Sequence, residues 1–146
     1  MESKNRKFGV ILLALVVLLT AALVFTGSAN AKTLYVDDDD GPEINFNTLQ
    51  DAIESANSGD SIFVFSGTYK ENVNINKDNL IIIGESKSNT TIQGIGKTCV
   101  YISAKQIAFS GFTLQNGEYG LRLNEAEGNK ISDCVITFCS SDGIRL

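Results

Sequence analysis

The feature that most constrains this 146-residue chain is an internal repeat with a period of roughly 20–30 residues. Five apolar or glycine positions recur at one common offset, and the unit that follows repeats at a slightly shorter offset. The pairs are Val73 and Val100, Ile75 and Ile102, Leu80 and Ile107, Ile82 and Phe109, Gly84 and Gly111, Leu114 and Ile136, and the tetrapeptides 120–123 and 143–146. Short strands and turns that repeat at such a period without helices predict a β-solenoid.

Each unit of a β-solenoid supplies strands that pair in parallel with the same strands of its neighbours, about 4.8 Å away. Alternate side chains point inward, so apolar residues at equivalent positions stack into one continuous core. An antiparallel sandwich would also explain the short strands, but it does not explain five matched positions at one offset. Leucine-rich repeats need an LxxLxLxxN frame, which this chain lacks. We therefore predict an all-β fold with parallel strands.

One strand and one short helix are expected ahead of the repeats, the strand at 33–36. Apolar residues in the segment 48–57 follow the i, i+3, i+4, i+7 spacing of a single helical face. Asn47, with Gln50 three residues later, matches a capping box, and Gly59 is a stop signal. A stripe this narrow must lie on another apolar surface. The apolar residues are Leu49, Ala52, Ile53 and Ala56.

Four segments match a pattern of one protein family: 46–53 (FNTLQDAI), 58–62 (SGDSI), 67–73 (GTYKENV) and 111–116 (GFTLQN). On these residues the chain resembles pectate-lyase-like, right-handed parallel β-helix repeat proteins of prokaryotic, especially archaeal, cell surfaces. The resemblance covers residues 32–146. It implies a right-handed β-helix whose open N-terminal end is covered by the helix. It implies little about function, because many activities share this scaffold.

The segment 1–31 differs from the rest of the chain. A basic start, an uncharged apolar run at 8–25 and the ending Ala29-Asn30-Ala31 predict a secretory signal peptide, with an uncleaved membrane anchor as the alternative. We divide the remainder into a strand and capping helix at 32–60 and the first coils of the β-helix at 61–146. The protein is expected to be secreted or on the cell surface, with membrane contact only through its N-terminal segment.

The last residues, 143–146, match a strand, so the β-helix is expected to be truncated at its C-terminus. Unpaired strand edges associate readily, and solenoids need a cap at each end. End-to-end self-association through the open C-terminal coil is the expected consequence.

The charge of the exported part excludes one class of partner. From Lys32 onward the chain holds 9 Lys and Arg residues against 16 Asp and Glu residues. An acidic surface repels phosphate backbones, so no nucleic-acid partner is expected.

The residues that could bind a metal ion or carry reactive thiols are one acidic run and three cysteines. The run Asp37–Asp40 offers oxygen ligands for Ca²⁺, but side chains alternate along an extended chain, so a solvated acidic loop is favoured and no metal or cofactor is predicted. Cys99, Cys134 and Cys139 lack CxxC spacing, and the chain has no histidine to complete a zinc site. Buried thiols are the prediction, although a bridge between Cys134 and Cys139 is geometrically allowed.

Pectin methylesterases share the opening segments, and the resemblance implies that their catalytic Asp residues follow the GFT segment in a GYQDTL-like stretch. The corresponding residues 131–142 contain no such motif. Asp133 and Asp142 are therefore predicted to be turn residues. No catalytic residue is assigned, and the chain itself is expected not to be an enzyme.

Two weaker site predictions remain. Arg122 and Arg145 are equivalent in successive repeats, so they should stack on one outer face and could grip a carboxylated sugar. The alternative is that they are solvated and paired with nearby acidic side chains (Glu118, Glu125 or Asp142). Asn89-Thr90-Thr91 is an N-glycosylation sequon.

Two functions follow from these patterns. The first is a non-catalytic cell-surface or envelope protein that binds polysaccharide or envelope components. The second is the N-terminal part of a carbohydrate-active enzyme, a polysaccharide lyase or hydrolase or a pectin-esterase-like protein, whose catalytic coils lie beyond residue 146.

Overall fold

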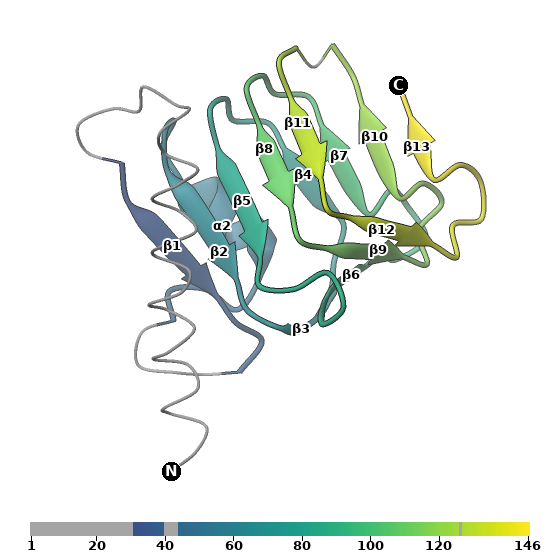
Figure 1. Ribbon diagram of the computed structural model, residues 1–146, viewed down its shortest axis with the longest axis horizontal. Coiled ribbons are helices and arrows are strands. Elements are labelled where there is room, and N and C mark those ends of the chain that lie inside the picture. The colour runs from purple at the N-terminus through teal and green to yellow at the C-terminus, as the bar shows by residue number, and fades with distance from the viewer. Residues whose placement is uncertain (1–30, 40–43, 126) are drawn as a thin grey trace.

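The computed structural model describes residues 31–39, 44–125 and 127–146, and its short strands wind into a solenoid of three sheets (Figure 1). The predicted signal peptide or anchor lies outside the described residues, apart from Ala31. In the described part of the chain, no helix is long and apolar enough to cross a membrane.

The three sheets run along the solenoid axis, and each coil from β2 onward contributes one strand to each sheet. Sheet A contains β1 (Thr33–Val36), β2 (Ser61–Val64), β5 (Ile81–Gly84), β8 (Ala108–Ser110) and β11 (Lys130–Ser132). Sheet B contains β3 (Gly67–Lys70), β6 (Thr90–Gln93), β9 (Thr113–Gln115) and β12 (Val135–Thr137). Sheet C contains β4 (Val73–Ile75), β7 (Val100–Ile102), β10 (Leu121–Leu123) and β13 (Ile144–Arg145).

The strand pairings confirm the predicted repeat. All pairings between the named strands are parallel. Val73 pairs with Val100 in the long repeat, and Leu114 pairs with Ile136 in the shorter one. The inward residues of successive coils form one buried core, which includes a stacked pair of phenylalanine rings. The fold is the expected parallel β-helix.

Helix α2 (Leu49–Ser55) takes the place of strands at the N-terminal end of the solenoid and packs against β1, β2 and β4. Leu49, Ala52 and Ile53 are fully buried, as their spacing predicts. Gln50 also closes the edge of sheet C, because its side-chain oxygen accepts the backbone N–H of Asn74 on β4 at 2.8 Å. The helix therefore covers both the apolar core and part of an unpaired strand edge.

The predicted capping box and stop signal are wrong in detail. The N-cap is Thr48, whose hydroxyl oxygen accepts the N–H of Asp51 at 3.2 Å, so Gln50 lies too early in the helix to serve as the box partner. The helix ends at Ser55, well before Gly59. Ala56 follows with extended backbone angles, and the ammonium group of Lys77 donates to the carbonyl oxygens of Glu54 and Ala56 at this end. Gly59 instead serves a turn, with φ at +95°.

The connections at the corners of the solenoid differ in length. Two residues join β2 to β3, β8 to β9 and β11 to β12, whereas the segment 85–89 joins β5 to β6. Between sheets B and C the connections have two, six, five and six residues in successive coils. The strand register survives these differences, so the corners absorb the changes in repeat length.

Candidate functional site

The outer face of sheet C carries one continuous column of side chains. Asn74, Tyr101, Arg122 and Arg145 occupy equivalent positions on its four strands. Their strand neighbours on the inner face, such as Val100, are buried, because side chains alternate along a strand. Arg122 and Arg145 are exposed and Tyr101 is half-buried. The predicted stacking of the two arginines on one outer face is therefore present.

Each guanidinium group lies on a tyrosine ring. The Arg122 guanidinium carbon is 5.8 Å from the ring centroid of Tyr101, and that of Arg145 is 5.1 Å from the ring centroid of Tyr119. Arg145 also donates a hydrogen bond to the Tyr119 hydroxyl. Cation–π contacts of this kind contribute about 0.5–1 kcal/mol at exposed sites. The two rings hold the arginine side chains in place.

Pairing with nearby carboxylates was the alternative for these arginines, and the structure does not support it. Within the described residues, the ion pairs join Lys87 to Asp133 and Lys105 to Glu127, and neither involves an arginine. Like charges directly opposite each other on neighbouring strands destabilise a sheet. The rings of Tyr101 and Tyr119 offset that repulsion without neutralising the two positive charges.

Sequence reasoning missed both tyrosines. The signal for Tyr101 was available, because Val100-Tyr101-Ile102 has the same alternation as Leu121-Arg122-Leu123, its pairing partner. Tyr119 precedes its strand and lies in a corner, where no repeat offset assigns it a neighbour.

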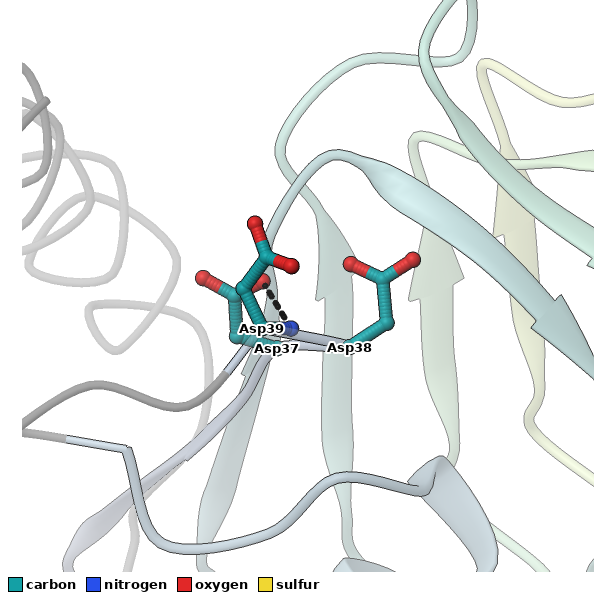
Figure 2. Close-up of side chains that lie close together, drawn as sticks. All are labelled: Asp37, Asp38 and Asp39. Carbon is teal, nitrogen blue, oxygen red and sulfur yellow. Dashed lines mark hydrogen bonds between the residues drawn. The ribbon is translucent and has the colours of Figure 1, made fainter.

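The acidic run after β1 forms a compact cluster (Figure 2). One carboxylate oxygen of each of Asp37, Asp38 and Asp39 lies within 4.8 Å of the others, and Asp40 is outside the described residues. The expected solvated loop is correct for Asp38 and Asp39 but wrong for Asp37, which is only 3% exposed.

Two of these carboxylates have structural roles. Asp37 accepts the N–H of Asp39 at 3.2 Å, and Asp38 accepts the N–H of Thr68, on β3, at 3.2 Å. The burial of Asp37 follows from a backbone contact with a distant residue, since its N–H donates to the carbonyl of Phe46 at 3.1 Å. The prediction that no metal binds here stays a prediction.

The two aspartates after the GFT segment lie in turns. Asp133 follows β11 at a turn position with φ at +49°, as predicted, and its carboxylate pairs with Lys87. Asp142 is exposed in the connection between β12 and β13, and its carbonyl accepts the N–H of Gly120 at 3.3 Å.

All three thiols are free. Cys99 is buried as predicted, whereas Cys134 and Cys139 are half-buried, and no bridge joins them. Burial raises the pKa of each thiol above its ordinary value, which lowers the fraction present as the reactive thiolate.

The described strands define a right-handed parallel β-helix protein, and solved structures share this fold. A pectin methylesterase in complex with hexasaccharide VII superposes with a TM-score of 0.68 at 17% identity, covering 82% of this chain and 46% of the other. The pectin methylesterase from carrot gives a TM-score of 0.65 at 19% identity, covering 76% of this chain and 41% of the other.

Sequence comparison also finds pectinesterases among the similar proteins. Pectinesterase A of Dickeya chrysanthemi is 26% identical over 158 residues, covering 91% of this chain and 43% of the relative. A cell surface glycoprotein of Methanothermus fervidus is 27% identical over 135 residues, covering 90% of this chain and 21% of the relative. The chain thus spans less than half the length of these curated relatives. No protein-family model matches it.

Proposed function

We propose that this chain is an exported, cell-surface β-helix protein that binds an acidic polysaccharide through the outer face of sheet C, without catalysing a reaction itself. The observation that carries the proposal is the register pairing of Arg122 with Arg145, each fixed on a tyrosine ring. The cell surface glycoprotein among the relatives supports the location, and the pectinesterases support a carbohydrate ligand.

The chemistry of the face suits a carboxylated sugar. A guanidinium group binds a carboxylate through two parallel N–H···O bonds, and it is less strongly hydrated than an ammonium group. Two such groups about 4.8 Å apart present a pair of positive charges to a polymer with repeated carboxylates. Because the rings already restrict both arginine side chains, binding loses less side-chain entropy than it would with free arginines.

The negative charge of the surrounding surface restricts where an acidic polysaccharide can bind. The exported part of the chain is strongly acidic, so a polyanion is repelled everywhere except where positive charge is concentrated. A neutral polysaccharide gains no charge attraction from the guanidinium pair. The ligand class is therefore a uronic-acid polymer and not a neutral glucan.

Calorimetric titration of the exported protein with oligogalacturonate, and with dextran as the neutral comparison, tests the proposal. Oligogalacturonate should bind, dextran should not, and Arg122→Ala and Arg145→Ala should each weaken binding about tenfold or more. Lys130→Ala, which removes an exposed positive charge from sheet A, is the matched control and should bind like the unchanged protein. Binding by both arginine variants equal to that of the unchanged protein would refute the assignment.

The second candidate function is that these coils are the N-terminal part of a carbohydrate-active enzyme. The observation in its favour is that two of the curated relatives are pectinesterases, each aligned over 91% of this chain. Methanol release from methyl-esterified pectin by the exported protein distinguishes the candidates. The binding proposal expects no release above buffer.

A further inference from the structure

The turn that carries the sequon is longer than its counterparts. Five residues, 85–89, connect β5 to β6, whereas two residues make each of the other connections from sheet A to sheet B. Asn89 is the last residue of this turn, and its side chain is exposed. The extra chain in this turn accounts for much of the difference between the long repeat and the shorter one that follows it.

The turn is held by its own contacts. The N–H of Asn89 donates to the carbonyl of Ser86 at 2.9 Å, and the carbonyl of Asn89 accepts the N–H of Gly67 at 2.9 Å. Lys87 pairs with Asp133, two coils farther along, and the Thr113 hydroxyl donates to the Lys87 carbonyl. These contacts fix the backbone of the turn, and the exposed side-chain amide of Asn89 takes part in none of them.

The three sequon residues are divided between the two sides of the chain. Thr90 is fully buried, and its hydroxyl oxygen accepts the N–H of Ser86 at 3.2 Å. Thr91 is half-exposed on the outer side of β6. Asn89 ends the turn with its side chain exposed, and Thr91 lies two residues farther along on the outer side of β6, so neither side chain is enclosed in the core. Both groups that define the sequon are accessible in the folded protein.

We propose that Asn89 is N-glycosylated during export. In this step the Asn89 amide nitrogen bonds to the anomeric carbon of a lipid-phosphate-linked oligosaccharide. The bond from that carbon to the lipid phosphate breaks, the lipid phosphate leaves, and the amide nitrogen loses one proton. Asn89-Thr90-Thr91 is the single N-x-S/T sequence in the chain. This inference does not depend on the proposed polysaccharide ligand.

The position of the glycan has a consequence for the surface. Thr68, Thr91 and Thr113 are paired in register on the outer face of sheet B, beside the attachment point. A bulky, hydrated glycan would cover this threonine row and the corner between sheets A and B. Sheet C, with Arg122 and Arg145, belongs to a different face of the solenoid and stays uncovered.

Peptide mapping of the full exported chain, purified from the cells that encode it, tests the proposal. Trypsin cleaves after Lys87 and Lys97, so the peptide 88–97 isolates the sequon. This peptide should carry a glycan mass, with fragment ions that assign the mass to Asn89. An unmodified 88–97 peptide from the exported protein would overturn the proposal.

Three variants separate the modification from effects on folding. Asn89→Gln and Thr91→Val should both abolish the glycan, whereas Thr91→Ser keeps the hydroxyl and should retain it. Asn116→Gln, at an exposed asparagine outside any sequon, is the matched control and should keep the glycan. A glycan that persists on peptide 88–97 in the Thr91→Val protein would also contradict the assignment.

Discussion

Glu71, on the connection between β3 and β4, accepts the backbone N–H of Leu49, the first residue of α2, at 2.9 Å. Its second carboxylate oxygen accepts the N–H of Gln50 at 3.0 Å. The first N–H groups of a helix lack partners within the helix, so Glu71 supplies what α2 cannot supply itself. The capping helix and the entry to β4 are thereby joined through one half-buried side chain.

Burial raises the pKa of Glu71 above 4.5, and the two hydrogen bonds from the helix only partly oppose this shift. A carboxyl group with a raised folded-state pKa disfavours the folded state as pH rises from 4.5 through that raised value. The unchanged protein should therefore lose stability relative to Glu71→Gln across this window, and the difference should level off above it. Thermal melts of both proteins across this pH range measure the effect. Parallel pH profiles would contradict it.

Leu49→Asp should abolish the cooperative thermal melt. Leu49 is fully buried between α2 and the first strands, and an unpaired charge there costs several kcal/mol, comparable with the stability of a small domain. Ser55→Asp places the same residue at an exposed position of the same helix and should change the melting temperature little. Thermal melts followed by circular dichroism compare the two variants with the unchanged protein. An unchanged melt for Leu49→Asp would show that the helix does not cover the core.

Tyr69→Phe should destabilise the protein by about 1–3 kcal/mol. The Tyr69 hydroxyl is buried and donates to the carbonyl of Phe65 at 2.9 Å, so its loss leaves a buried acceptor without this donor. Tyr101→Phe removes a hydroxyl from a half-buried ring and should cost less than about 0.5 kcal/mol. Denaturant unfolding of both variants compares the costs. Equal costs would mean that the Tyr69 hydrogen bond contributes nothing.

Gly84→Ala should be more destabilising than Gly96→Ala. A Cβ atom at Gly84 would lie 2.3 Å from the carbonyl oxygen of Gly111 in the next coil, so the backbones would have to separate. Overpacking of this kind costs about 1–3 kcal/mol. At Gly96 the space is open, and only the positive φ of +64° disfavours alanine, by about 1 kcal/mol. Melting temperatures in the reverse order would refute the close approach of the two coils.

The repeat offsets predicted the strand pairing because, in a parallel solenoid, residues that are one repeat apart in the sequence lie opposite each other on neighbouring strands. Val73 pairs with Val100 and Leu114 with Ile136 for that reason. The helical face was equally visible, since burial of Leu49 and Ile53 follows from their spacing alone.

The features that could not be predicted from the sequence depend on contacts between residues that are far apart in the chain. The helix begins one residue later than the capping signal indicates, with Thr48 as its N-cap, and Glu71 and Gln50 tie this end of the helix to the start of sheet C. Asp37 is buried because the chain returns beside it at Phe46. Tyr119 reaches Arg145, far along the sequence, from a corner that the repeat does not align.

The uneven connections between sheets B and C have a practical consequence for protein engineering. This corner already varies from two to six residues while every strand stays in place. The segment 94–99 includes Gly96, around which no atom would obstruct a new side chain. A foreign peptide spliced into this segment should be displayed at a defined height on the solenoid, and successive coils would allow several peptides to be arrayed at a spacing of about 4.8 Å per coil.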